Sequence, residues 1–77
     1  MISAVVLVNT EIDSQSSVIE HLRKVEGIEE AHALYGVYDL IVRIKAISID
    51  KIKEIINQYI RRLNGVTNSL TLMIVNS

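Results

Sequence analysis

The sequence predicts an α+β fold in which one sheet carries two helices. Its 77 residues suit a single domain, 1–77, without space for a second core. Apolar β-branched runs and amphipathic segments alternate in the order β-α-β-β-α-β. A weak repeat separates two similar halves, because Leu22–Ile28 is echoed by Ile60–Val66 at the two expected helix ends. Two such β-α-β units form a ferredoxin-like sandwich, a four-stranded antiparallel sheet with both helices on one face.

The first half starts with a nearly continuous apolar run over Ile2–Thr10, which is typical of a strand covered on both faces. An amphipathic helix follows and should end at Gly27. Ser17 and Glu20 have the spacing of a capping box at its start. Other candidate N-cap and core-facing residues of this helix are Asp13, Ser14, Val18, Leu22 and Val25.

The second half starts with a hairpin, in which 28–35 and 37–47 read as strands around a tight connection at Gly36. Ser48 should cap the second helix. The last strand is expected within 66–75, after the helix stops at Gly65. The core-facing stripe of the second helix is predicted to comprise Ile52, Ile55, Ile56, Tyr59 and Leu63.

The sheet face away from the helices is expected to be apolar. Leu40, Val42, Ile44 and Ala46 share the phase that meets the helices, whereas the first and last strands are apolar in both phases. Burial of a Leu or Val contributes roughly 1.5–3 kcal/mol, enough for several per chain to drive sheet-to-sheet dimerisation. The alternative is that loops cover this face. In the first strand, Val5 and Leu7 point to the face opposite Val6 and Val8. In the last strand, Leu72 and Ile74 point to the face opposite Met73 and Val75.

Composition excludes several classes of protein. The chain has no Cys, so a disulfide framework and thiolate metal sites are ruled out, in agreement with a cytoplasmic location. No run approaches the roughly 20 apolar residues of a membrane span, and the start has no signal-peptide pattern. The net charge of −1 gives no sign of the positively charged surface that nucleic-acid binding requires. We therefore expect neither a membrane nor nucleic acid as a direct partner.

The segment Gly36, Val37, Tyr38 and Asp39 combines a permissive turn, backbone N–H groups, a ring and a carboxylate. These groups suit an amino acid, whose ammonium would pair with Asp39 and whose carboxylate would accept from the turn. The alternative is an ordinary hairpin turn in which Asp39 bonds local backbone. Ser69 and Thr71 are two further candidate residues, because both should present hydroxyls to a ligand on one face of the last strand. The alternative is that they are ordinary polar residues at the start of a strand.

Catalytic and metal chemistry find little support. His21 and His32 have no companions at metal-ligand spacing, and we expect no metal or cofactor. No glycine elbow accompanies Ser16 or Ser17, and no phosphate loop is present. Basic pairs occur at the helix ends, where interaction with the negative end of the helix dipole explains them. These pairs are Arg23 with Lys24 and Arg61 with Arg62.

In combination, three ordered segments resemble the ligand-binding domain of the Lrp/AsnC transcription regulators. These segments are Ala4–Thr10, Gly36–Val42 and Gly65–Leu72. The resemblance covers essentially the whole chain without the family's helix-turn-helix. The chain is similar to stand-alone regulation-of-amino-acid-metabolism (RAM) domains of prokaryotes, especially archaea.

The resemblance implies dimers with facing sheets, rings of octameric or decameric kind, and amino acids bound between subunits. It places ligand contacts on Gly36, Val37, Tyr38 and Asp39, with Ser69, Thr71 and Met73 contributing from the last strand of the same or another subunit. Pairing with full-length Lrp/AsnC regulators is a further implication. Two alternatives stay open: a small dimeric α/β-barrel oxygenase or isomerase, and a purely structural subunit.

Overall fold

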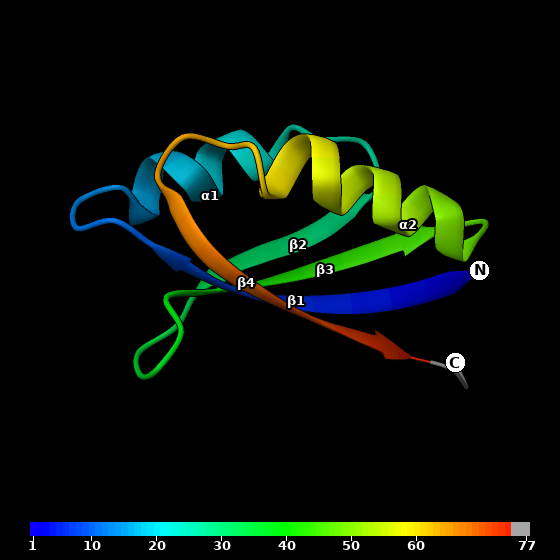
Figure 1. Ribbon diagram of the computed structural model, residues 1–77, viewed down its shortest axis with the longest axis horizontal. Helices are drawn as coiled ribbons and strands as arrows, with labels where there is room; N and C mark the ends of the chain where they lie inside the picture. The colour runs from blue at the N-terminus through cyan, green and yellow to red at the C-terminus, as the bar shows by residue number, and fades with distance from the viewer. Residues whose placement is uncertain (75–77) are drawn as a thin grey trace.

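The computed structural model describes residues 1–74 and has two layers, with the helices stacked on one face of a single sheet (Figure 1). Val75, which the sequence assigned to the last strand, lies outside the described residues. The elements, in chain order, are β1 (Ile2–Thr10), α1 (Gln15–Arg23), β2 (Ile28–Ala33), β3 (Leu40–Ala46), α2 (Ile49–Ile55), the π-helical turn η1 (Ile56–Ile60) and β4 (Val66–Ile74).

The sheet is four-stranded in the order β2-β3-β1-β4, and each neighbouring pair is antiparallel. This is the strand order of the ferredoxin-like sandwich, so the predicted fold class is confirmed. Strand β1 lies in the centre beside β3, and β4 forms an edge. The second helix packs against β1 and β3, whereas α1 packs against β2. The edge strand β4 therefore lies beyond the close packing of the second helix.

Alternation along the central strands separates core from outer face. Val6 and Val42 pair across β1 and β3 and are fully buried beneath the helices, which confirms the predicted phase of β3. Their neighbours Leu7 and Ile41 also pair, but they point to the opposite face and keep part of their surface exposed. The other buried apolar side chains of the core are Ala4, Val8, Val18, Leu22, Ile28, Ala31, Leu40, Ile44, Ala46, Ile52, Ile55, Ile56 and Ile60.

The two helix starts differ in their capping. Ser48 caps α2 as predicted, because its Oγ accepts a hydrogen bond from the Lys51 amide at 3.1 Å. Helix α1 starts at Gln15, with Ser14 at the N-cap and no side-chain capping bond. Ser17 therefore lies inside the helix, where its Oγ donates to the Ser14 carbonyl at 3.0 Å. The predicted capping box at Ser17 is wrong.

The second helix ends in a π-helical turn that the periodicity did not predict. The Arg61 amide donates to the Ile56 carbonyl at 2.9 Å, five residues back. This wider turn holds one extra residue and shifts the helical phase. Ile60 is therefore fully buried, and Tyr59 stays 45% exposed. The expectation that Tyr59 belongs to the core stripe is wrong for this reason.

The predicted hairpin between β2 and β3 is present, but its connection is a loop over 34–39 instead of a tight turn at Gly36. The Leu34 amide donates to the Asp39 carbonyl at 2.8 Å and closes the base of this loop. The loop projects from one end of the sheet, away from the helical layer (Figure 1). Its residues are therefore available to an incoming molecule.

The internal repeat is confirmed in three dimensions at both helix ends. Ile28 donates its amide to the Val25 carbonyl at 3.2 Å, and Val66 donates to Leu63 at 3.1 Å. The glycine before each of these strands has positive φ, +97° at Gly27 and +100° at Gly65. Each half thus leaves its helix by the same backbone turn.

Candidate functional site

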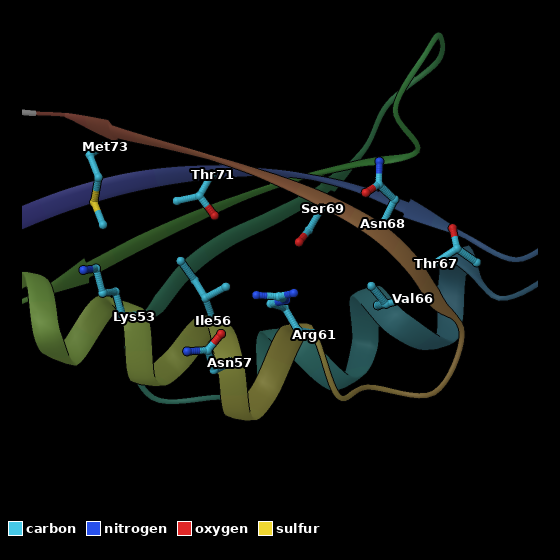
Figure 2. A pocket seen from close by; sticks show the side chains of 10 residues that line it. All are labelled: Lys53, Ile56, Asn57, Arg61, Val66, Thr67, Asn68, Ser69, Thr71 and Met73. Carbon is cyan, nitrogen blue, oxygen red and sulfur yellow. The ribbon is translucent and has the colours of Figure 1, made fainter.

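Three predicted site residues of the last strand lie together on the side of the sheet that faces the helices. Ser69, Thr71 and Met73 alternate along β4, and their side chains extend toward the second helix (Figure 2). They line a cavity of about 700 Å³ between β4 and the end of that helix. The prediction that both hydroxyls share one face of the strand is therefore confirmed. The other residues lining this β4 cavity are Lys53, Ile56, Asn57, Arg61, Val66, Thr67 and Asn68.

The β4 cavity carries positive charge although the whole chain has a net charge of −1. Among residues 1–74, its lining includes the cations Lys53 and Arg61 and no carboxylate. Hydroxyl and amide groups from Asn57, Ser69 and Thr71 add hydrogen-bonding capacity. This combination suits a small anionic ligand better than a cation.

The turn residues Gly36, Val37, Tyr38 and Asp39 lie elsewhere. They belong to the loop between β2 and β3, and none of the four lines the β4 cavity. Val37 is 86% exposed, and open space surrounds Gly36. One chain therefore does not bring the two predicted groups of site residues together.

Asp39 anchors this loop to the end of β1. Its Oδ2 accepts hydrogen bonds from the Thr10 amide at 2.8 Å and from Asn9 Nδ2 at 3.4 Å. Its own amide donates to the Val8 carbonyl at 2.9 Å, and Gln15 Nε2 donates to its carbonyl oxygen at 2.6 Å. The Asp39 side chain therefore bonds backbone, as the hairpin alternative expected, but this backbone belongs to the distant strand β1 and not to the turn itself. Both side-chain bonds go to Oδ2, which leaves Oδ1 for an added donor.

Sequence reasoning missed where two arginine side chains at the helix ends lie. Arg23 does not bond the carbonyls that end its own helix: its Nε and Nη2 donate to the Ala31 carbonyl of β2 at 3.1 and 2.8 Å. The Arg61 side chain rises from the end of η1 toward Ser69 (Figure 2). The repeat between the two halves was the signal that could have linked these residues to the sheet.

The histidines behave as expected for surface side chains. His32 Nε2 lies 3.4 Å from Glu30 Oε1 on the outer sheet face. Within residues 1–74, no group of three or more His, Cys, Asp or Glu side chains is arranged to hold a metal ion. No helix in the described part of the chain is long and apolar enough to cross a membrane.

The domain is thus a two-layer sandwich with a polar, cationic cavity beside its edge strand. A family model described as "Lrp/AsnC ligand binding domain" matches residues 3–77, so the chain belongs to this family. This finding confirms the predicted resemblance and the class of regulatory domain.

Relatives agree with this assignment. An uncharacterised HTH-type transcriptional regulator of Pyrococcus furiosus is 27% identical over 74 residues, which cover 92% of this chain and 49% of the relative. The chain therefore spans about half the length of such curated relatives. These homologues are regulators and not enzymes, which argues against the oxygenase or isomerase alternative.

Solved structures show the same fold. A hypothetical protein from Pyrococcus horikoshii has a TM-score of 0.93 and 26% identity, with 100% of this chain and 93% of that chain covered. A transcriptional regulator from Neisseria meningitidis, solved as an L-Met complex, has a TM-score of 0.87 and 14% identity. The match covers 97% of this chain and 50% of that regulator.

Proposed function

We propose that this chain is a self-associating regulatory domain that binds an amino acid between its subunits and responds by changing its assembly. The family supports the regulatory class. The L-Met complex of the Neisseria meningitidis regulator supports an amino acid as the kind of effector. The domain would act in the cytoplasm, alone or by joining full-length Lrp/AsnC regulators that carry the same domain. No bond is made or broken in this function.

The observation that carries self-association is an apolar stripe on the outer sheet face. Leu7 of β1 lies between Ile41 of β3 and Leu70 of β4 in the register, and Val5 pairs with Leu72. Leu70 and Leu72 remain 44% and 49% exposed, and no loop within residues 1–74 buries them. The apolar stripe consists of Val5, Leu7, Ile41, Leu70, Leu72 and Ile74.

A second copy of the chain is a suitable partner for the apolar stripe. Its border on β2 and β3 carries both signs of charge, with Glu30 lying 3.6 Å from Arg43 and Glu29 lying 3.7 Å from Lys45. A two-fold dimer places the same surface on both sides, so an apolar centre with a mixed-charge border can complement itself. Further contacts between dimers would build the octameric or decameric ring.

Assembly also explains how separated site residues would act together. The loop with Gly36, Val37, Tyr38 and Asp39 projects from one end of its subunit, whereas Ser69, Thr71 and Met73 lie on an edge strand. In the proposed assembly, the loop of one subunit approaches β4 of another. Asp39 Oδ1 would then accept from the ammonium of the amino acid. A ligand held by two subunits favours the assembled state, and tenfold selectivity corresponds to about 1.4 kcal/mol per site.

Size-exclusion chromatography with light scattering tests this function. The wild-type chain is measured over a concentration series, without ligand and with each of the twenty amino acids at millimolar concentration, and its thermal midpoint is recorded in parallel. We expect a dimer or larger ring whose mass or midpoint responds to particular amino acids. A monomer indifferent to all twenty would refute the proposal. An oligomer indifferent to all twenty would establish a structural subunit instead.

A further inference from the structure

The two halves of the fold use equivalent arginines differently. In the repeat, Arg23 corresponds to Arg61, because each is the second residue of its segment, Leu22–Ile28 or Ile60–Val66. The first residue of each segment, Leu22 or Ile60, is fully buried, and each segment ends by entering a strand. The same spacing along the chain makes Ser69 of β4 the counterpart of Ala31 of β2.

In the first half, the space between helix and edge strand is closed by protein. The Arg23 guanidinium donates twice to the Ala31 carbonyl, through Nε and Nη2. Ala31 is almost fully buried beneath α1, which packs directly on β2. The arginine of this half is therefore bound to the sheet through Nε and Nη2.

In the second half, the corresponding space is the β4 cavity. Arg61 and Ser69 point toward one another across it (Figure 2). The Arg61 side chain makes no hydrogen bond or ion pair with any of residues 1–74. A guanidinium has five donors in a planar fork, and the Arg61 side chain, which keeps much of its surface exposed, lines a cavity that also carries polar groups.

The π-helical turn accounts for the position of Arg61. Its amide bonds the Ile56 carbonyl, so Arg61 lies one wide turn beyond Ile56 on the same side of the helix. Ile56 lines the β4 cavity, and the turn therefore directs Arg61 toward the cavity as well. Isolated π turns frequently occur at functional sites.

We propose that Arg61 binds the carboxylate of a small organic acid in the β4 cavity, with Ser69 and Asn57 as neighbouring donors. A carboxylate matches the guanidinium fork in a bidentate arrangement. Lys53, two helical turns earlier and about 12 Å along the axis, adds to the positive field. Ile56 and Met73 offer apolar contact to the body of the acid.

This inference deepens the proposed function, on which it rests for the claim that the domain binds a small molecule. It assigns the carboxylate of the ligand to Arg61 instead of the backbone amides around Gly36. An amino acid and its 2-oxo acid share this carboxylate, and only the amino acid carries the ammonium expected at Asp39. The two sources can therefore be distinguished by experiment.

NMR titration of the full chain tests the assignment. The probes are each of the twenty amino acids, 4-methyl-2-oxopentanoate, and the carboxamide of every amino acid that binds. The Arg61 Nε–H and Ser69 amide signals are followed in the wild-type chain, and affinities are measured for Arg61→Gln and Arg62→Gln. Arg62 is the matched control, because it is the adjacent exposed arginine and does not line the cavity.

We expect at least one carboxylate probe to shift the Arg61 signal, with affinity at least tenfold lower in Arg61→Gln and within twofold of wild type in Arg62→Gln. The carboxamide of that probe should bind wild type and Arg61→Gln equally. If a probe shifts only the NMR signals of the 36–39 loop, and its affinity is unchanged in Arg61→Gln, the inference is overturned and the proposed function still stands. The absence of any shift at Arg61 with every probe would also overturn it. Conversely, a carboxylate bound at Arg61 with no effect of amino acids on assembly or thermal midpoint would refute the proposed function alone.

Discussion

Replacing Leu72 by aspartate tests the role of the apolar stripe in self-association. Complete burial of a leucine side chain contributes about 1.5–3 kcal/mol. Because Leu72 is 49% exposed, covering its remaining surface would contribute roughly half of that amount per subunit. A two-fold dimer buries this residue twice, which gives a total of about 1.5–3 kcal/mol.

This total corresponds to a roughly 10- to 150-fold increase in the dimer dissociation constant. The aspartate adds a further penalty, because its charge would lose water in the interface. Sedimentation velocity over a concentration series should therefore show Leu72→Asp dissociating at concentrations at which the wild type remains assembled. Circular dichroism would verify that the variant keeps its fold.

Ile12→Asp is the matched control. Ile12 is 92% exposed, precedes α1 and lies outside the apolar stripe. It presents a large apolar side chain to solvent, and its replacement should leave the assembly unchanged. If Leu72→Asp has the same mass distribution as the wild type, or if Ile12→Asp dissociates the assembly equally, the outer sheet face is not the interface.

Three further substitutions test local features by thermal unfolding. Ser48→Ala should lower the free energy of unfolding by about 1 kcal/mol, and the thermal midpoint by roughly 4–8 °C, because it removes the α2 cap. Ser14→Ala should lower stability less, because Ser14 makes no side-chain capping bond. Equal losses of stability in the two variants would contradict the capping assignment. Gly65→Ala should cost about 1–2 kcal/mol, because φ is +100° there and a new Cβ would lie 3.0 Å from Ser14 Cβ; an unchanged midpoint would contradict this. Asp39→Ala should cost about 1–3 kcal/mol by leaving the Thr10 amide without its acceptor. Asp39→Asn keeps an oxygen there and should retain most stability while abolishing the response to amino acids; a retained response would remove Asp39 from the site.

The fold was predictable because its signals are local and agree with one another. Alternation along β3 identified the buried phase of Leu40, Val42 and Ile44, and each of these is fully buried. Ser48 was recognisable as a cap because its bond to Lys51 is formed within one turn. The repeat placed Gly27 and Gly65 at equivalent helix exits. Such features depend on neighbours close in sequence, which is why periodicity and spacing suffice.

The errors have a common physical origin. Tyr59 lost its predicted place in the core because a π turn inserts one residue into the helical period, and a fixed period of 3.6 residues does not contain this change. Ser17 has capping-box spacing, yet the loop after β1 starts the helix earlier, at Gln15. Leu34 and Asp39 close a longer loop than the glycine at position 36 suggested.

The candidate site shows the same division. The sequence by itself identified the chemistry of the last strand, since Ser69, Thr71 and Met73 must share one face of any strand with period two. It also identified Asp39 as a carboxylate at a turn. Only the tertiary structure decided that Asp39 Oδ2 is held by Thr10 and that Arg61 faces Ser69 across a cavity. The physical reason is that a cavity is formed by side chains far apart in the sequence, whose meeting depends on how the helix packs over the sheet.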